Sequence, residues 1–141
     1  MIDRSIIGEE SEPYYYKVDR SAVEKFYEAI GNHESFEHLY KQKDSDDRLR
    51  APLTFPTTFR AYQPEWYEKL DRSKLLHAEQ EYIYERRIYV GDVIKCVEKV
   101  TDIYEKQGRS GKLTFIVREK KGYDENDELI FTEIQTLVVR E

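Results

Sequence analysis

The spacing of hydrophobic residues predicts one amphipathic helix in the first third of the chain. Its apolar face falls at positions i, i+3, i+4 and i+7: Val23, Phe26, Tyr27 and Ile30. Ser21, followed three residues later by Glu24, has the spacing of a capping box, which marks a helix start. Gly31 and the residue after it are typical of a helix end. The pattern therefore predicts a helix that ends near residue 30 and turns one face toward a core.

From residue 75 onward the chain alternates β-prone runs with short turns. The predicted strands cover residues 79–90, 93–106, 112–123 and 129–140, and a shorter one covers 14–18. In the last predicted strand, apolar residues lie on both faces. One face carries Ile130, Ile134 and Val138, and the other carries Leu129, Phe131, Leu137 and Val139. Two apolar faces indicate a sheet that is covered on both sides. We expect the helix to cover one side and a second subunit to cover the other.

Prolines limit regular structure between the helix and the strands. Pro52 and Pro56 bar a regular helix through residues 51–59, and a helix that starts near residue 57 should be interrupted at Pro64. The chain of 141 residues is long enough for one domain with one core, spanning residues 1–141. The predicted fold class is α+β, with a long antiparallel sheet wrapped around a central helix.

Composition narrows the classes of function. There are 23 basic and 29 acidic residues, for a net charge of −6, so no basic surplus is available to neutralise nucleic-acid phosphates or an anionic membrane. The single Cys96 excludes an intrachain disulfide and a cysteine-based zinc site, which is typical of a cytoplasmic protein. The first residues are followed by charged residues rather than by the apolar run of a signal peptide. No apolar run approaches the roughly 18 residues that a membrane span needs. We expect a cytoplasmic domain that binds neither nucleic acid nor membrane.

Several short segments, in the same order, resemble the N-terminal domain family of MaoC-like dehydratases. They are residues 18–23 with Phe26, residues 51–56 (Ala-Pro-Leu-Thr-Phe-Pro), residues 75–92 and residues 106–117. The resemblance implies a hot-dog fold and a fatty-acyl thioester on coenzyme A or acyl carrier protein as ligand, with no metal or redox cofactor. It also implies a homodimer, or a heterodimer with a catalytic MaoC-like hot-dog subunit. The latter is the arrangement of the substrate-holding subunits of (3R)-hydroxyacyl-ACP dehydratases.

The residues that follow the predicted helix depart from the catalytic pattern of such enzymes. Hydration of an enoyl thioester needs a base, an acid and donors for the developing enolate oxygen. Catalytic relatives supply the first two within Gly-Asp-x-Asn-Pro-x-His. Here Gly31 matches, but Asn32 stands in place of Asp and Glu37 in place of His, with His38 one residue further on. An asparagine amide is no base at neutral pH. The sequence thus favours a hydratase domain whose catalytic pair is degenerate.

Five other residues are candidate substrate contacts. Thr54, Phe55 and Pro56 form a non-helical segment that is expected to lie beside the helix and line an acyl pocket. His77 is expected either to donate a hydrogen bond near the substrate or to fix the start of a strand. Gln80 is expected either to contact the substrate or to bond at a subunit interface.

Three functions follow from these residues. The chain is a substrate-holding half that needs a catalytic partner, or an active homodimeric hydratase in which Glu34 or Glu37 works with His33 or His38. The third and weakest is a hot-dog thioesterase with Glu65 or Glu68 as base. We favour the first function, an acyl-thioester-binding subunit of a (3R)-hydroxyacyl-ACP or -CoA dehydratase.

Overall fold

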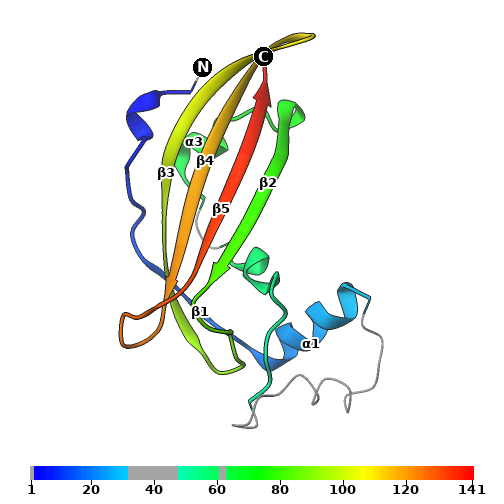
Figure 1. Ribbon diagram of the computed structural model, residues 1–141, viewed down its shortest axis with the longest axis vertical. Helices are drawn as coiled ribbons and strands as arrows, with labels where there is room; N and C mark the ends of the chain where they lie inside the picture. Colours follow the sequence, from blue (N-terminus) through cyan, green and yellow to red (C-terminus); the bar gives the residue numbers. More distant parts are fainter. Residues whose placement is uncertain (1, 32–47, 61–62) are drawn as a thin grey trace.

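One five-stranded antiparallel sheet dominates the computed structural model of the chain, which describes residues 2–31, 48–60 and 63–141. The strands are β1 (Tyr14–Lys17), β2 (Leu75–Tyr84), β3 (Val93–Gly108), β4 (Gly111–Tyr123) and β5 (Leu129–Arg140). They lie in the order β1-β3-β4-β5-β2, so β1 and β2 form the two edges (Figure 1). The α+β class predicted from the sequence is confirmed.

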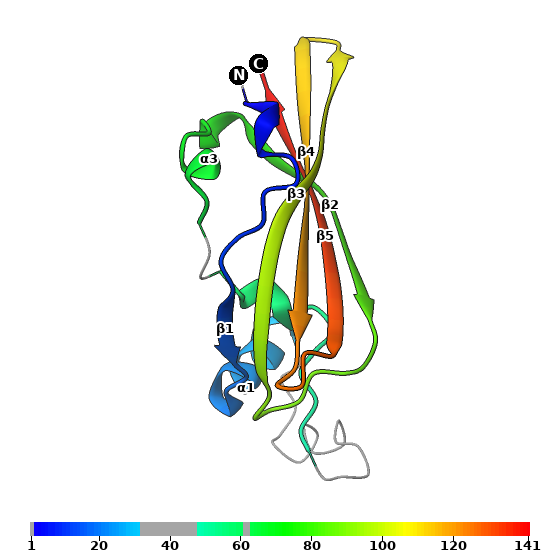
Figure 2. The ribbon, with the colours of Figure 1, turned by 90° about the vertical axis from the view of Figure 1, so that its left-hand side faces the viewer.

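Helical segments are short. They are η1 (Arg4–Ile6), α1 (Arg20–Ala29), η2 (Phe55–Thr58), α3 (Glu65–Glu68) and η3 (Arg72–Lys74). Both α1 and α3 lie on the same side of the sheet, which we call the covered face (Figure 2). No described helix lies on the opposite, open face (Figure 2). Leu76 and Ile83 of β2 are on that face, because they pair with Val138 and Thr132 of β5, and they remain 56% and 43% exposed. The second cover that the sequence predicts is therefore absent from the described part of this single chain.

The predicted helix exists, but its start differs from the prediction. Helix α1 begins at Arg20 after Asp19, and the side chain of Asp19 makes no capping hydrogen bond. Glu24 instead accepts a hydrogen bond from Arg20 at 3.0 Å, so the capping box at Ser21 is not formed. Of the predicted apolar face, Val23 and Tyr27 are buried and Phe26 packs against the core, whereas Ile30 is 56% exposed beyond the last turn.

The strand predicted at residues 79–90 was misplaced. Strand β2 starts at Leu75 and ends at Tyr84, and a loop follows. The Asp92 carboxylate fixes this loop, because it accepts from the Arg86 guanidinium and from the Tyr89 N–H, both at 2.9 Å. The other strand predictions agree with β1, β3, β4 and β5 to within two residues. The helix expected after residue 57 is reduced to the single turn of α3, with Pro64 at its N-cap.

Two hydrophobic clusters lie between the sheet and the segments that cover it. The α1 cluster joins α1 and η2 to the sheet, and its buried members include Val23, Phe55, Phe59, Ile94, Cys96 and Phe131. The α3 cluster lies further along the strands and contains Val100, Ile103, Ile116, Leu137 and Val139, with Trp66, Tyr67 and Leu70 packed against it. Polar side chains of the covered face separate the two clusters.

Candidate functional site

A cavity of about 700 Å³ lies against the covered face between the two clusters. Strands β2, β3, β4 and β5 form one wall, and Thr57, Phe59, Arg60, Gln63, Tyr67 and Arg72 form the other. Phe59 of the α1 cluster closes one end, and Tyr67, Leu75 and Leu137 lie at the other. Apolar side chains thus occur at both ends of a lining that is otherwise mostly polar and includes Thr57, Arg60, Gln63 and Arg72.

Its middle is crossed by polar side chains in register on neighbouring strands. One row runs Glu98, Lys120, Glu133 and Tyr82, and the next runs Arg118, Gln135 and Gln80. We call these seven residues the polar belt. Residues at alternate positions of a strand share a face, so β4 brings Arg118 and Lys120, and β5 brings Glu133 and Gln135, to the same side. The belt thus spans the sheet from β3 to β2.

The buried charged groups of the belt have hydrogen-bond and ion-pair partners within the protein. The Lys120 ammonium donates to the Phe59 carbonyl at 2.9 Å and lies 3.7 Å from the Glu133 carboxylate. Glu98 accepts from the Tyr14 hydroxyl at 2.7 Å and lies 4.0 Å from the Arg118 guanidinium. Charged groups that leave water need such partners.

Three polar atoms of the belt have no hydrogen-bond partner among the described residues. They are Arg118 Nε, Glu133 Oε2 and Gln135 Oε1, and each is shielded from solvent. All three side chains line the cavity. These three atoms are therefore sealed within the belt, while the side chains that carry them give the cavity a polar middle.

Burial also suppresses ionisation around the cavity. It raises the pKa of Tyr82, and the neighbouring Glu133 carboxylate raises it further. Burial likewise raises the pKa of the Cys96 thiol to about 12, with Glu98 and Glu133 acting in the same direction against Lys120. Tyr82 and Cys96 are thus neutral at pH 7, and neither is suited to act as a base or nucleophile.

The predicted substrate contacts divide into two groups. His77 and Gln80, on β2, both line the cavity, and the imidazole Nε2 of His77 lies 3.2 Å from the Gln135 amide nitrogen. Phe55 and Pro56 are buried in the α1 cluster region and Thr54 is exposed, while their neighbours Thr57 and Phe59 line the cavity. The catalytic positions Asn32, Glu37 and His38 lie outside the described residues, as do His33 and Glu34.

Sequence reasoning missed the charged members of the belt. Arg118, Lys120 and Glu133 were not among the residues singled out from the sequence, yet Lys120 and Glu133 are only 6% and 5% exposed. One signal was available: in β4, Arg118 and Lys120 continue the alternation of the buried Thr114 and Ile116. Only the register of the neighbouring strands shows that these charges meet opposite charges.

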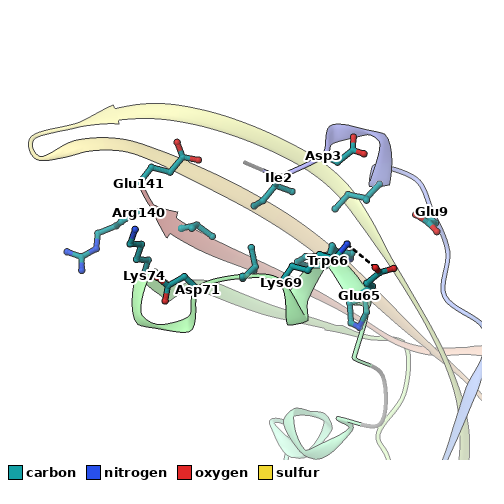
Figure 3. Close-up of a pocket in the computed structure, with 14 residues that line it drawn as sticks. Ile2, Asp3, Glu9, Glu65, Trp66, Lys69, Asp71, Lys74, Arg140 and Glu141 are labelled. Carbon is teal, nitrogen blue, oxygen red and sulfur yellow. Dashed lines mark ion pairs between the residues drawn. The ribbon is translucent and has the colours of Figure 1, made fainter.

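A second cavity of about 810 Å³ lies beyond α3, between that helix, η1 and the end of β5 (Figure 3). Its apolar lining includes Ile2, Ile6, Trp66 and Leu70. The charged residues at its rim include an ion pair between Glu65 and Lys69 at 2.9 Å, drawn in Figure 3. Adjacent residues of α3 line different cavities, Trp66 this one and Tyr67 the cavity at the belt.

Residues 2–31, 48–60 and 63–141 contain no group of three His, Cys, Asp or Glu side chains arranged to hold a metal ion. Within those same residues no helix is long and apolar enough to cross a membrane.

Known proteins are similar to this chain in sequence or in fold. A UPF0336 protein of Thermobifida fusca is 27% identical over 149 residues, covering 99% of this chain and 94% of that protein. The crystal structure of the C-terminally truncated HadBC (3R-hydroxyacyl-ACP dehydratase) complex from Mycobacterium tuberculosis superposes with a TM-score of 0.75 at 22% identity, over 94% of this chain and 96% of that one. A MaoC-like dehydratase superposes with a TM-score of 0.79 at 20% identity, over 96% of this chain and 42% of that one. These likenesses confirm the predicted hot-dog fold.

The sequence also matches a family model over most of its length. The model describes the dehydratase domain region of FAS1-like proteins and matches residues 5–133. This match shows that the chain belongs to the FAS1-like dehydratase domain family.

Proposed function

We propose that this chain is the acyl-thioester-binding subunit of a (3R)-hydroxyacyl dehydratase, and that it pairs with a second hot-dog subunit that supplies the catalytic Asp and His. The carrier of the acyl group is coenzyme A or acyl carrier protein. The observation that carries the proposal is the 700 Å³ cavity between the sheet and its covering segments, which has apolar ends and no acid–base pair among its described lining residues.

The placement of His77 supports this division of labour. Among the described residues it is the one histidine, and its imidazole contacts the Gln135 amide. It lies opposite Leu137, so Glu133 is four residues further along β5, roughly 13 Å at 3.3 Å per residue. A general base that orients water needs its partner within hydrogen-bond reach. His77 is thus placed to position a ligand rather than to exchange protons with Glu133.

The position of β2 at the edge of the sheet supports the proposal that a partner subunit binds. It pairs on one side with β5, and no described strand lies along its other side. An unpaired edge of ten residues is a template for main-chain hydrogen bonds to another chain. Leu76 and Ile83 project from this strand toward the open face and would be covered by the same partner. The related HadBC structure is itself a complex of dehydratase subunits.

An assay of crotonyl-CoA hydration, monitored as the loss of the enoyl absorbance, tests the proposal. We expect no turnover by the purified chain alone, and turnover once a hot-dog subunit with an intact Asp and His is added. Asn32→Asp/Glu37→His, which restores the pattern Gly-Asp…His, is the matched gain-of-function variant, with Asn32→Asp alone as its control. Activity of the double variant alone would show that the chain binds the acyl thioester in a productive position.

Steady turnover by the unmodified chain would overturn the proposal. If that turnover disappeared in Glu37→Gln or His38→Ala, the chain would be an active homodimer with a displaced acid–base pair. The titration of decanoyl-CoA into the chain by calorimetry measures the binding role separately from catalysis. Failure to bind any acyl-CoA, alone or with the partner, would contradict the substrate-holding role.

A further inference from the structure

The rest of the chain treats the two edges of the sheet differently. From Val93 to Val100 the outer edge of β3 is occupied, first by β1 and then by the N-terminal segment. In that segment Gly8 and Ser11 donate backbone N–H groups to carbonyls of β3, each at 2.7 Å. The outer edge of β2 has no such neighbour among the described residues. Its ten residues include no proline and no lysine, with which proteins commonly block an exposed edge. Strand β2 is therefore open to another chain along its whole length.

The open face of β2 is apolar near both ends and acidic in the middle. Leu76 and Ile83 lie near the ends, with Glu79 and Glu81 between them. All four share a face, because their partners alternate along β5: Val138, Thr132, Thr136 and Ile134. Both carboxylates are exposed, and the β5 residues opposite them carry no counter-charge. A strand that pairs with the open edge therefore meets two negative charges at its centre.

A second copy of this chain is a poor partner for that edge. In an antiparallel pair with a twofold axis through Gln80, Glu79 of each copy lies opposite Glu81 of the other. An axis through Glu79 or Glu81 instead brings that residue opposite its own copy. Like charges that lie directly opposite each other on neighbouring strands are destabilising. The apolar ends would fit, because Ala78 is the unpaired residue of a bulge and Leu76 then comes opposite Ile83 of the other copy. The acidic centre is thus the part of the edge that opposes self-pairing.

We infer that Glu79 and Glu81 select a heterologous partner, whose edge strand carries Lys or Arg at the two facing central positions and apolar residues near its ends. The inference rests on the proposed function, in which a second hot-dog subunit binds at β2, and it names what that subunit presents there. The partner strand runs antiparallel to β2, as every neighbouring pair in this sheet does. Main-chain hydrogen bonds join the two strands, and ion pairs replace the like-charge contacts of a self-pair. Partner choice follows, because specificity is a difference between two affinities.

Charge reversal in the full chain tests the inference, with light scattering coupled to gel filtration as the measurement. We expect the parent chain to be monomeric. Glu79→Lys should form a homodimer, because the new lysine of each copy lies opposite Glu81 of the other. Glu79→Lys/Glu81→Lys should be monomeric alone and should form a 1:1 heterodimer with the parent, at least about tenfold tighter than any self-association of the parent. Glu12→Lys makes the same change of charge beside the opposite edge of the sheet, next to Ser11, and should stay monomeric.

Overall charge does not account for these expected results. Each replacement adds two units to the net charge of −6, so the double variant carries −2 and both members of the mixed pair are negative. Added salt should weaken the mixed pair and strengthen any self-association of the parent, because it screens attraction and repulsion alike.

Two results would overturn the inference: a parent homodimer that is stable at low salt, or no association of either Glu79→Lys or the mixed pair. Thermal melting checks that each variant is folded, and Glu81→Lys, equivalent to Glu79→Lys by the twofold symmetry, decides if that variant does not fold. Neither result bears on acyl-CoA binding, so calorimetry with decanoyl-CoA still tests the proposed function separately.

Discussion

Lys120 and Glu133 face each other across β4 and β5 with 3.7 Å between Nζ and Oε1, and their side chains are only 7% and 6% exposed. Lys120→Met should destabilise the protein by about 3–5 kcal/mol, because it leaves the Glu133 carboxylate buried without a counter-charge. The double variant Lys120→Met/Glu133→Leu should recover most of that loss, because it removes both members of the pair and leaves no carboxylate at position 133 without a counter-charge. Urea unfolding of the two variants and the parent chain measures both effects.

Lys121→Met is the matched control for this pair. Lys121 lies on the open face of the same strand, is 41% exposed and pairs with Glu119 at 3.2 Å. Its removal should change the free energy of unfolding by no more than about 0.5 kcal/mol. A double variant as unstable as Lys120→Met would mean that the carbonyl of Phe59, which also loses its donor, accounts for the cost.

The β-prone runs and the turns between them predicted β5 to the residue and placed β3 and β4 within two residues, because the turn residues mark where each strand begins and ends. The belt could not be predicted in the same way. Lys120 and Glu133 are 13 residues apart in sequence, as the register of the β4–β5 hairpin requires, and a charge on a strand is ordinarily read as exposed. The end of β2 was missed because Asp92 organises the loop through side-chain hydrogen bonds that no periodicity reports. Thr54, Phe55 and Pro56 remain predictions as substrate contacts, as do His77 and Gln80.

Gly122 has a packing role that a substitution can expose. A Cβ at this position would lie 2.2 Å from Cε1 of Phe131, its partner across β4 and β5, and Phe131 is fully buried in the α1 cluster. We expect Gly122→Ala to cost about 1–3 kcal/mol by overpacking. Gly122→Ala/Phe131→Leu should be less destabilised than the sum of the two single variants, because the smaller side chain makes room. A double-mutant cycle by chemical unfolding measures the coupling, and additive effects would contradict the close approach.

Glu65 is expected to be irrelevant to catalysis. The hydrogen bond and charge of Lys69 lower the pKa of its carboxyl, and the side chain is 82% exposed at the rim of the second cavity (Figure 3). A thioesterase base needs a raised rather than a lowered pKa and shelter from bulk water. Glu65→Gln should therefore leave the melting temperature and any release of free coenzyme A from decanoyl-CoA unchanged. A rate of thiol release that falls in Glu65→Gln would revive the thioesterase hypothesis.

The edge strand β2 is the surface at which we expect a partner subunit to bind. Leu76 and Ile83 lie on the open face of the edge strand, opposite Val138 and Thr132 of β5. Charged replacements there, Leu76→Asp and Ile83→Lys, leave the covered face and the belt untouched, so the melting temperature of the isolated subunit should change little. They should weaken pairing with a second hot-dog subunit by roughly tenfold or more, because each places an unpaired charge in a newly buried contact. Light scattering coupled to gel filtration measures this, and unchanged assembly would place the partner elsewhere.

Alkaline pH should destabilise the fold through Cys96. Burial raises the pKa of its thiol from an unfolded value of 9.0 to about 12, so between these values the unfolded chain releases a proton that the native protein keeps. The stability contributed by the neutral thiol is fully present below pH 9 and is lost as the pH rises toward 12. At pH 10.5 the loss should be about 2 kcal/mol, from 1.36 kcal/mol per pKa unit. Tyr14 and Tyr84, whose pKa values burial also raises, act in the same direction. Cys96→Ala isolates the thiol: the difference in unfolding free energy between pH 7 and pH 10.5 should shrink by this amount. An unchanged difference, or rapid labelling of Cys96 by a thiol reagent in the native protein, would mean that solvent reaches this end of the α1 cluster.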